Sequence, residues 1–313
     1  MEHNDWTKQP TAQPTARPNI VMFIVMSYYF VIGRHFVQPL LLDPFYEIIG
    51  IYPLSSWQRI LNIFFRDFGI LIIVYLIYLL IKKKSIRSAF SITKMTWQNV
   101  AYITVMTLTI RVFFNLIESG VPFLWGSRQV PMQNFYFMDI GSSLIHNAIL
   151  ATLFEELVFR GFLWHEYRKQ GVSYWKMALA IGLFFGIIHG GTFNIIHTTI
   201  AGIFFYAPLI YFTRSIWSVI IHHAIINAGY TLISPTFYIS NQADFDAFMP
   251  TYLIILVIAT IILLPFAIIC AKKFYHENKH HLQVKENLPA ETKSFKISYW
   301  ILIAIMVATF LRA

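Results

Sequence analysis

Long apolar stretches alternate with short polar segments along most of the chain. A helix needs about 20 apolar residues to cross the hydrocarbon core of a bilayer, because each residue advances it by about 1.5 Å. Such stretches occur at residues 19–40, 57–81, 97–117, 137–165, 174–189, 195–212, 215–233, 250–271 and 297–311. The pattern predicts an all-α fold, a polytopic transmembrane helical bundle with about eight or nine membrane helices.

The composition excludes the soluble globular class. Hydrophobic residues make up 57% of the chain and charged residues 12%, whereas a soluble domain has roughly 25% charged residues. Outer-membrane barrels show alternating segments of roughly 10 residues, and the apolar stretches of this chain do not alternate. The single cysteine, Cys270, excludes an intramolecular disulfide and a cysteine-cluster zinc site.

The formal net charge of +9 indicates orientation in the lipid bilayer rather than a nucleic-acid partner, because Lys and Arg gather beside the apolar stretches. Cytoplasmic loops of membrane proteins are enriched in these residues. The rule predicts that 82–94, 166–176 and 272–296 are cytoplasmic and that the acidic loop 234–249 is external. The N-terminus is then cytoplasmic. The Lys-, Ile- and Phe-rich composition suggests a bacterial cell membrane.

Polar segments divide the chain into four parts. We expect a cytoplasmic tail at 1–18, N-terminal membrane helices at 19–136, a helical core at 137–233, and C-terminal membrane helices at 234–313 with a polar linker at 274–296. Two further segments are predicted to be loops: 41–56, and 118–135 with its Gly and Pro residues.

Two adjacent carboxylates and an arginine interrupt the apolar stretch 137–165. Ionisable groups at that depth usually face a bundle interior or a water-filled cavity, where they mark function. Glu156 and Arg160 are four residues apart, so they share a helix face and can pair. Glu155 is rotated by about 100° from its neighbour and has no partner on its own helix. One glutamate is therefore expected to be neutralised and the other to act on a substrate.

Polar side chains at similar depth interrupt two later helices. His189 ends the stretch 174–189, and His223 and Asn227 share a face within 215–233. Counting about 1.5 Å per residue places Glu155 and these three residues within roughly 10 Å of one another along the membrane normal. We expect them to meet in one cavity.

These residue types allow two kinds of hydrolytic site. A carboxylate and a neutral imidazole can hold and deprotonate a water, and a His and an Asn can donate to the oxyanion that follows. Alternatively, Glu155, His189 and His223 can ligate zinc, with a water in the open position. The spacing leaves both open, because no His-Glu-x-x-His helix is present.

Glu155-Glu156-x-x-x-Arg160, Phe185-x-x-x-His189 and His223-x-x-x-Asn227 resemble the three motifs of the CPBP family, in the same order. This family comprises CAAX prenyl endopeptidases and bacterial Abi-type, bacteriocin-processing and self-immunity proteins. One motif alone would be weak, but three together are specific. The resemblance implies a CPBP-like catalytic helical core at 137–233 and the activity of an intramembrane endopeptidase.

The resemblance also implies roles for single residues. Water would be activated by Glu155 and His189, the oxyanion stabilised by His223 and Asn227, and the site supported by the pair Glu156 and Arg160. The CAAX members look like glutamate-dependent enzymes, so no metal or other cofactor is favoured, and zinc is the alternative. The implied partner is a membrane-embedded or membrane-associated peptide or protein, and in a bacterium a prenylated substrate is not favoured.

Other polar groups in the apolar stretches are given structural interpretations. Pairing, snorkelling or hydrogen bonding between helices accounts for His146, Asn147, Arg111, His222 and the pair Arg66–Asp67. His197 is predicted to be interfacial and is a minor candidate for a metal ligand.

Two functions compete with the endopeptidase. One is a non-catalytic immunity or scaffold protein of the Abi type, against which the intact set of motifs speaks. The other is a transporter that uses the buried Glu and His as a proton relay. The chain shows none of the internal repeats typical of transporters.

Overall fold

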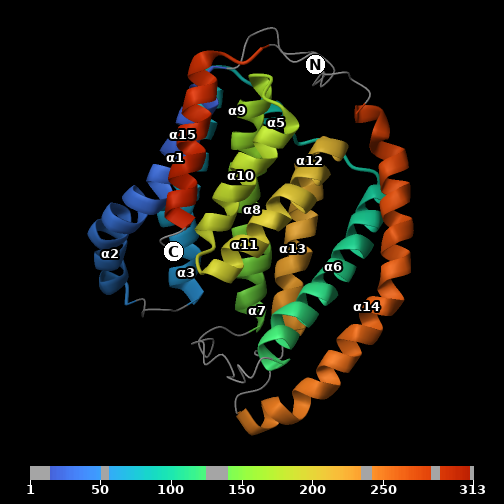
Figure 1. Ribbon diagram of the computed structural model, residues 1–313. Helices are drawn as coiled ribbons and strands as arrows, with labels where there is room; N and C mark the ends of the chain where they lie inside the picture. The colour runs from blue at the N-terminus through green and yellow to red at the C-terminus, as the bar shows by residue number, and fades with distance from the viewer. Residues whose placement is uncertain (1–14, 51–55, 125–139, 234–241, 283–289, 311–313) are drawn as a thin grey trace.

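The computed structural model describes residues 15–50, 56–124, 140–233, 242–282 and 290–310. Helices and no strands form this part of the chain (Figure 1), which confirms the all-α prediction. Six helices are long and apolar enough to cross a membrane, and a seventh span results if one bent pair is counted as one. Each of the nine apolar stretches is helical over most of its described residues. The protein is therefore a multi-pass bundle, and its division into four parts remains a prediction.

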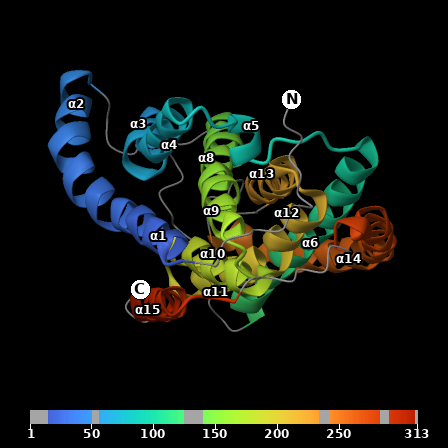
Figure 2. The ribbon, with the colours of Figure 1, turned by 90° about the horizontal axis from the view of Figure 1, so that it is seen from above.

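The first helix is longer than predicted. It comprises α1 (Arg17–Ser27), a π-helical segment η1 (Tyr28–Leu42) and α2 (Asp43–Ile48). The helix thus continues through 41–48, where the sequence predicts a loop; residues 51–55 lie outside the described part. Tyr46 is buried and donates a hydrogen bond of 2.9 Å to Asn62, which holds this end against the next helix. Figure 2 shows this helix leaving the bundle on the side opposite α14.

The second helix is bent rather than straight. It consists of α3 (Ser56–Asn62), η2 (Ile63–Asp67) and α4 (Gly69–Ile81), with an angle of 55° between its two halves. The break lies at Phe68, directly after Arg66 and Asp67. These two side chains form two hydrogen bonds of 2.7 and 3.0 Å, so the predicted pair is present. The short α5 (Ile86–Ala89) follows.

α6 (Trp97–Leu124) and α14 (Gln242–Asn278) run side by side at one edge of the bundle (Figure 1). Both are longer than the sequence predicts. α6 continues through Gly120 and Pro122, and a Cβ on Gly120 would lie 3.3 Å from the Leu253 side chain of α14, so the two helices pack closely there. α14 extends into the predicted linker because Asn278 and Asn99 of α6 exchange hydrogen bonds of 3.2 and 2.9 Å.

The core helices come next in the chain, between α6 and α14. One continuous helix is made of α7 (Ile140–Ser143), η4 (Leu144–Ala151), α8 (Thr152–Glu156), η5 (Leu157–Leu163) and α9 (Trp164–Lys169). It is followed by α10 (Tyr174–Ile188), α11 (Thr192–Ala201), η6 (Gly202–Tyr206), α12 (Ala207–Thr213) and α13 (Ile216–Ile233). The π-helical segments flank the five residues of α8, which carry both glutamates. Such wide turns often occur at functional sites.

Close approach of α10 and η6 depends on two glycines. A Cβ built on Gly202 would lie 2.9 Å from the Cα of Gly182, a separation that side chains do not tolerate. The pair therefore lets the two helices touch through their backbones, as small residues do in membrane bundles. This contact brings the end of η6 towards α8 and α10.

The C-terminal helix α15 (Lys293–Phe310) follows the short 3-10 turn η8 (Lys279–Leu282) and lies beside α1 (Figure 1). The buried Asn19 of α1 donates to the Ser298 hydroxyl over 2.7 Å, and Tyr167 donates to Asn19 over 2.8 Å. α1 and α15 are thus tied to each other and, through Tyr167 of α9, to the core.

Candidate active site

Glu156 is fully buried and accepts two hydrogen bonds at the same oxygen. Arg160 donates from Nη1 over 3.0 Å, so the predicted pair is present. His223 of α13 donates from Nδ1 over 2.8 Å, because a carboxylate oxygen can only accept. Glu156 therefore orients a histidine as well as neutralising an arginine, a contact that the sequence did not reveal.

Arg160 lies between two aromatic rings. Its Cζ is 4.2 Å from the ring centroid of Phe185 and 4.5 Å from that of Tyr206. Rings at these distances attract a guanidinium through their quadrupoles, most strongly where water is excluded. The aromatic residue of the Phe185-x-x-x-His189 motif thus stabilises the arginine of the first motif.

His189 directly follows α10, where the backbone turns sharply. Gly190 and Gly191 adopt φ values of 64° and 70°, which glycine accepts without strain. The His189 Nδ1 donates to the carbonyl oxygen of Phe185 over 2.7 Å. Tyr29 of η1 also donates to the Ile188 carbonyl over 3.2 Å. The ring is therefore held with Nε2 pointing away from its own helix.

One carboxylate oxygen of Glu155 lies close to both His189 and His223. This oxygen, Oε2, lies 4.0 Å from His189 Nε2 and 3.9 Å from His223 Nε2. Each ring already uses its Nδ1 proton elsewhere, so the neutral form of each presents an Nε2 lone pair towards the carboxylate. Oε2 is buried, and no described residue gives it a hydrogen bond. Two imidazole lone pairs thus point towards one carboxylate oxygen, and these three acceptors lack a shared hydrogen-bond donor.

Asn227 lies one turn beyond His223 on α13, as predicted, but its amide hydrogens are in use. Nδ2 donates to the Asn147 carbonyl oxygen over 2.9 Å and to Thr152 Oγ1 over 3.3 Å. Both acceptors belong to the helix that carries the glutamates. In this arrangement Asn227 holds α13 against that helix.

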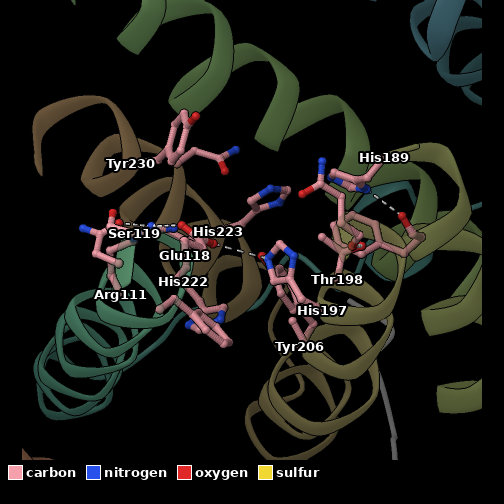
Figure 3. A pocket seen from close by; sticks show the side chains of 17 residues that line it. Arg111, Glu118, Ser119, His189, His197, Thr198, Tyr206, His222, His223 and Tyr230 are labelled. Carbon is pink, nitrogen blue, oxygen red and sulfur yellow. Dashed lines mark hydrogen bonds and ion pairs between the residues drawn. The ribbon is translucent and has the colours of Figure 1, made fainter. Parts of the chain in front are cut away.

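A cavity of about 420 Å³ lies beside the histidines and Asn227 (Figure 3). His189, His223 and Asn227 line it, while Glu155 lies beside the histidines and is not part of its wall. The opposite side is formed by α6, where the buried Arg111 bonds to Asn115 and Glu118. The structure therefore brings Glu155, His189 and His223 together, with Asn227 in the wall of the adjoining cavity.

Three histidines outside the motifs, His222, His197 and His146, contact polar side chains. His222 shares a 2.7 Å hydrogen bond with Thr107 of α6, which agrees with its predicted structural role. His197 lies 3.9 Å from Glu118 and lines the cavity, and its position at the membrane interface stays a prediction. His146 bonds to its neighbour Asn147 on the same helix, and the Asn147 carbonyl accepts a hydrogen bond from Asn227 of α13, which is a bond between helices as predicted for Asn147.

A metal ion would have to use Glu155, His189 and His223. Both histidines donate from Nδ1 to a carbonyl or a carboxylate, as metal-ligating histidines do. As the side chains stand, however, no group of three His, Cys, Asp or Glu among the described residues is arranged to hold a metal ion. The donor types suit zinc but their present separations do not, so the zinc alternative requires these three side chains to draw together.

Comparison with known proteins bears on the same helices. The model of the family described as type II CAAX prenyl endopeptidase Rce1-like matches residues 140–229. No curated protein and no solved structure matches the chain. The matched segment runs from α7 into α13 and contains all three motifs. Over residues 140–229 the chain is thus similar to Rce1-like type II CAAX prenyl endopeptidases, which confirms the resemblance of its motifs to the CPBP family of membrane proteases.

Proposed function

We propose that this protein is an intramembrane endopeptidase that hydrolyses a peptide bond in a membrane-associated peptide or protein. The observation that carries the proposal is the approach of two histidine Nε2 atoms to one oxygen of Glu155, at 4.0 and 3.9 Å. A water placed between them can give a hydrogen bond to the carboxylate and another to an imidazole lone pair. The similarity to Rce1-like endopeptidases supports the same reaction class.

In the first step Glu155 takes a proton from this water while His189 orients it, and the hydroxide attacks the scissile carbonyl carbon. The carbonyl π electrons move onto oxygen, which becomes the oxyanion of a tetrahedral intermediate. Collapse of this intermediate re-forms the carbonyl and breaks the bond to nitrogen. The proton held by Glu155 passes to the leaving amine. One water is consumed, and a carboxylic acid and an amine are released.

His223 serves this reaction from a fixed orientation. Its Nδ1–H is held by Glu156, whose charge is balanced by Arg160. When His223 also carries a proton on Nε2, it donates to the oxyanion and the Glu156 carboxylate stabilises the imidazolium. The buried pair Glu156–Arg160 thus supports the site by positioning His223.

The test replaces Glu155 with glutamine, which keeps the volume of the side chain but cannot take the proton. Membranes that contain wild type or Glu155→Gln are incubated, and new protein N-termini are identified by terminal-amine labelling and mass spectrometry, so the substrate need not be known. We expect cleavage products in the wild type and their loss in the variant. Glu166→Gln is the matched control, since this buried glutamate bonds to Arg17 at the end of the same helix, away from the cavity. If wild type and Glu155→Gln gave the same products, the endopeptidase hypothesis would be refuted and the scaffold hypothesis favoured.

A zinc-dependent form of the same protease is the second candidate, because two histidines and a carboxylate converge with both Nδ1 atoms occupied. Zinc bound by these three residues would supply a polarised water in place of the glutamate base. Elemental analysis of the purified protein separates the two candidates.

A further inference from the structure

Tyr206 is the last residue of η6, and no sequence motif marks it. Its ring is held on several sides. The ring centroids of His222, His223 and Phe185 lie 4.8, 5.3 and 5.3 Å away, and the Arg160 guanidinium lies over its face. Only 4% of the residue is exposed, yet it lines the cavity beside His223. The position of this tyrosine is therefore set by the same residues that build the site.

The hydroxyl of Tyr206 is unused within the described part of the chain. No described residue forms a hydrogen bond with it, and it is not among the buried polar atoms that are closed off without a partner. Buried tyrosine hydroxyls usually have a partner, because desolvating one without compensation is unfavourable. An O–H group that lines a cavity and lacks a protein partner is available to a ligand.

Three polar side chains that line the same cavity, Asn227, His223 and His222, already use their donors. The amide hydrogens of Asn227 go to Asn147 and Thr152. His223 donates from Nδ1 to Glu156. His222 donates from Nδ1 to Thr107, because the Thr107 hydroxyl donates its own hydrogen to the Ile103 carbonyl over 2.6 Å. In their neutral forms the two histidines therefore offer only acceptors on their remaining ring nitrogens.

We propose that the Tyr206 hydroxyl donates a hydrogen bond to the scissile carbonyl oxygen and stabilises it as it becomes an oxyanion. The inference rests on the proposed endopeptidase activity and adds a catalytic residue to it. The bond strengthens as negative charge develops on that oxygen, and Tyr206 keeps its proton throughout. The packing of its ring against Arg160 and His223 supplies the rigidity that an oxyanion donor needs.

The test is Tyr206→Phe, which removes one oxygen and keeps every ring contact. A peptide that spans a cleavage site found by the labelling experiment is synthesised and used with purified protein in detergent. We expect kcat to fall by about 10²-fold with KM within twofold of wild type, since the bond forms mainly in the transition state. The thermal unfolding midpoint should stay within about 2 °C of wild type. Tyr174→Phe is the control, because Tyr174 packs against Trp164, Trp175 and Tyr211 at the far end of α10.

The outcomes separate this inference from the proposed function. If Glu155→Gln abolishes cleavage while Tyr206→Phe retains kcat within twofold of wild type, the endopeptidase stands and the role of Tyr206 is wrong. The role of Tyr206 would also be refuted if Tyr174→Phe lost as much kcat as Tyr206→Phe, or if Tyr206→Phe clearly lost thermal stability. If wild-type and Glu155→Gln membranes give the same N-termini, both proposals fail together.

Discussion

Replacing Arg160 with methionine should destabilise the fold through the carboxylate that remains. The guanidinium is 1% exposed and Glu156 is fully buried, so no water can solvate the charge left behind. Breaking a buried pair by removing one partner typically destabilises by roughly 3–5 kcal/mol. Loss of the guanidinium between Phe185 and Tyr206 adds up to about 2 kcal/mol, because both ring contacts are desolvated.

The double variant Glu156→Gln, Arg160→Met separates charge from packing. Removing both charges leaves side chains of similar volume, and such replacements are often neutral or stabilising. We expect the double variant to regain most of the lost stability in thermal or SDS-induced unfolding of the purified protein. Cleavage should remain reduced, because glutamine holds His223 through a neutral amide and cannot stabilise an imidazolium. A double variant that unfolds as readily as Arg160→Met would show that the pair does not stabilise this helix.

Three further predictions concern metal, topology and packing. Activity should survive exhaustive chelation; stoichiometric zinc in the purified protein, with activity lost on its removal, would make the site a zinc centre. After Cys270→Ser, a cysteine at Ser85 should be labelled only from the cytoplasmic side and one at Ala243 only from outside, and labelling of both from one side would refute the orientation. Gly202→Ala should lower stability by about 1–3 kcal/mol, since its Cβ would meet the Gly182 backbone at 2.9 Å; a variant with unchanged unfolding would show that the helices can move apart freely.

The pattern of apolar and polar residues was sufficient to predict the all-α fold class and the ion pair Glu156–Arg160. Both depend on short-range properties, namely the number of consecutive apolar residues and the separation of two residues on one helix face. The ends of helices were less predictable. α6 and α14 continue past their predicted ends because each packs along the other, as at Gly120 against Leu253, a contact that composition does not encode.

Depth counting along separate helices grouped Glu155, His189 and His223, because residues at a similar height on packed helices can lie side by side. It could not show which atoms face one another. The Phe185 carbonyl and the Glu156 carboxylate accept the Nδ1–H groups of His189 and His223, and this decides that both histidines present Nε2 to Glu155. The first orientation depends on the backbone at the end of α10, and the second on the packing of α13 against the helix that carries Glu156.

What the sequence by itself determined is therefore a membrane helical bundle with one charged pair and a set of reacting groups at similar depth. Only the tertiary structure decided how those groups are engaged: Glu156 holds His223 across 67 residues, and Asn227 donates to Asn147 across 80. Tyr206 enters the site because Gly182 and Gly202 let η6 approach α10. The physical reason is that helical periodicity relates residues within one turn or two, whereas contacts between helices depend on how their surfaces pack.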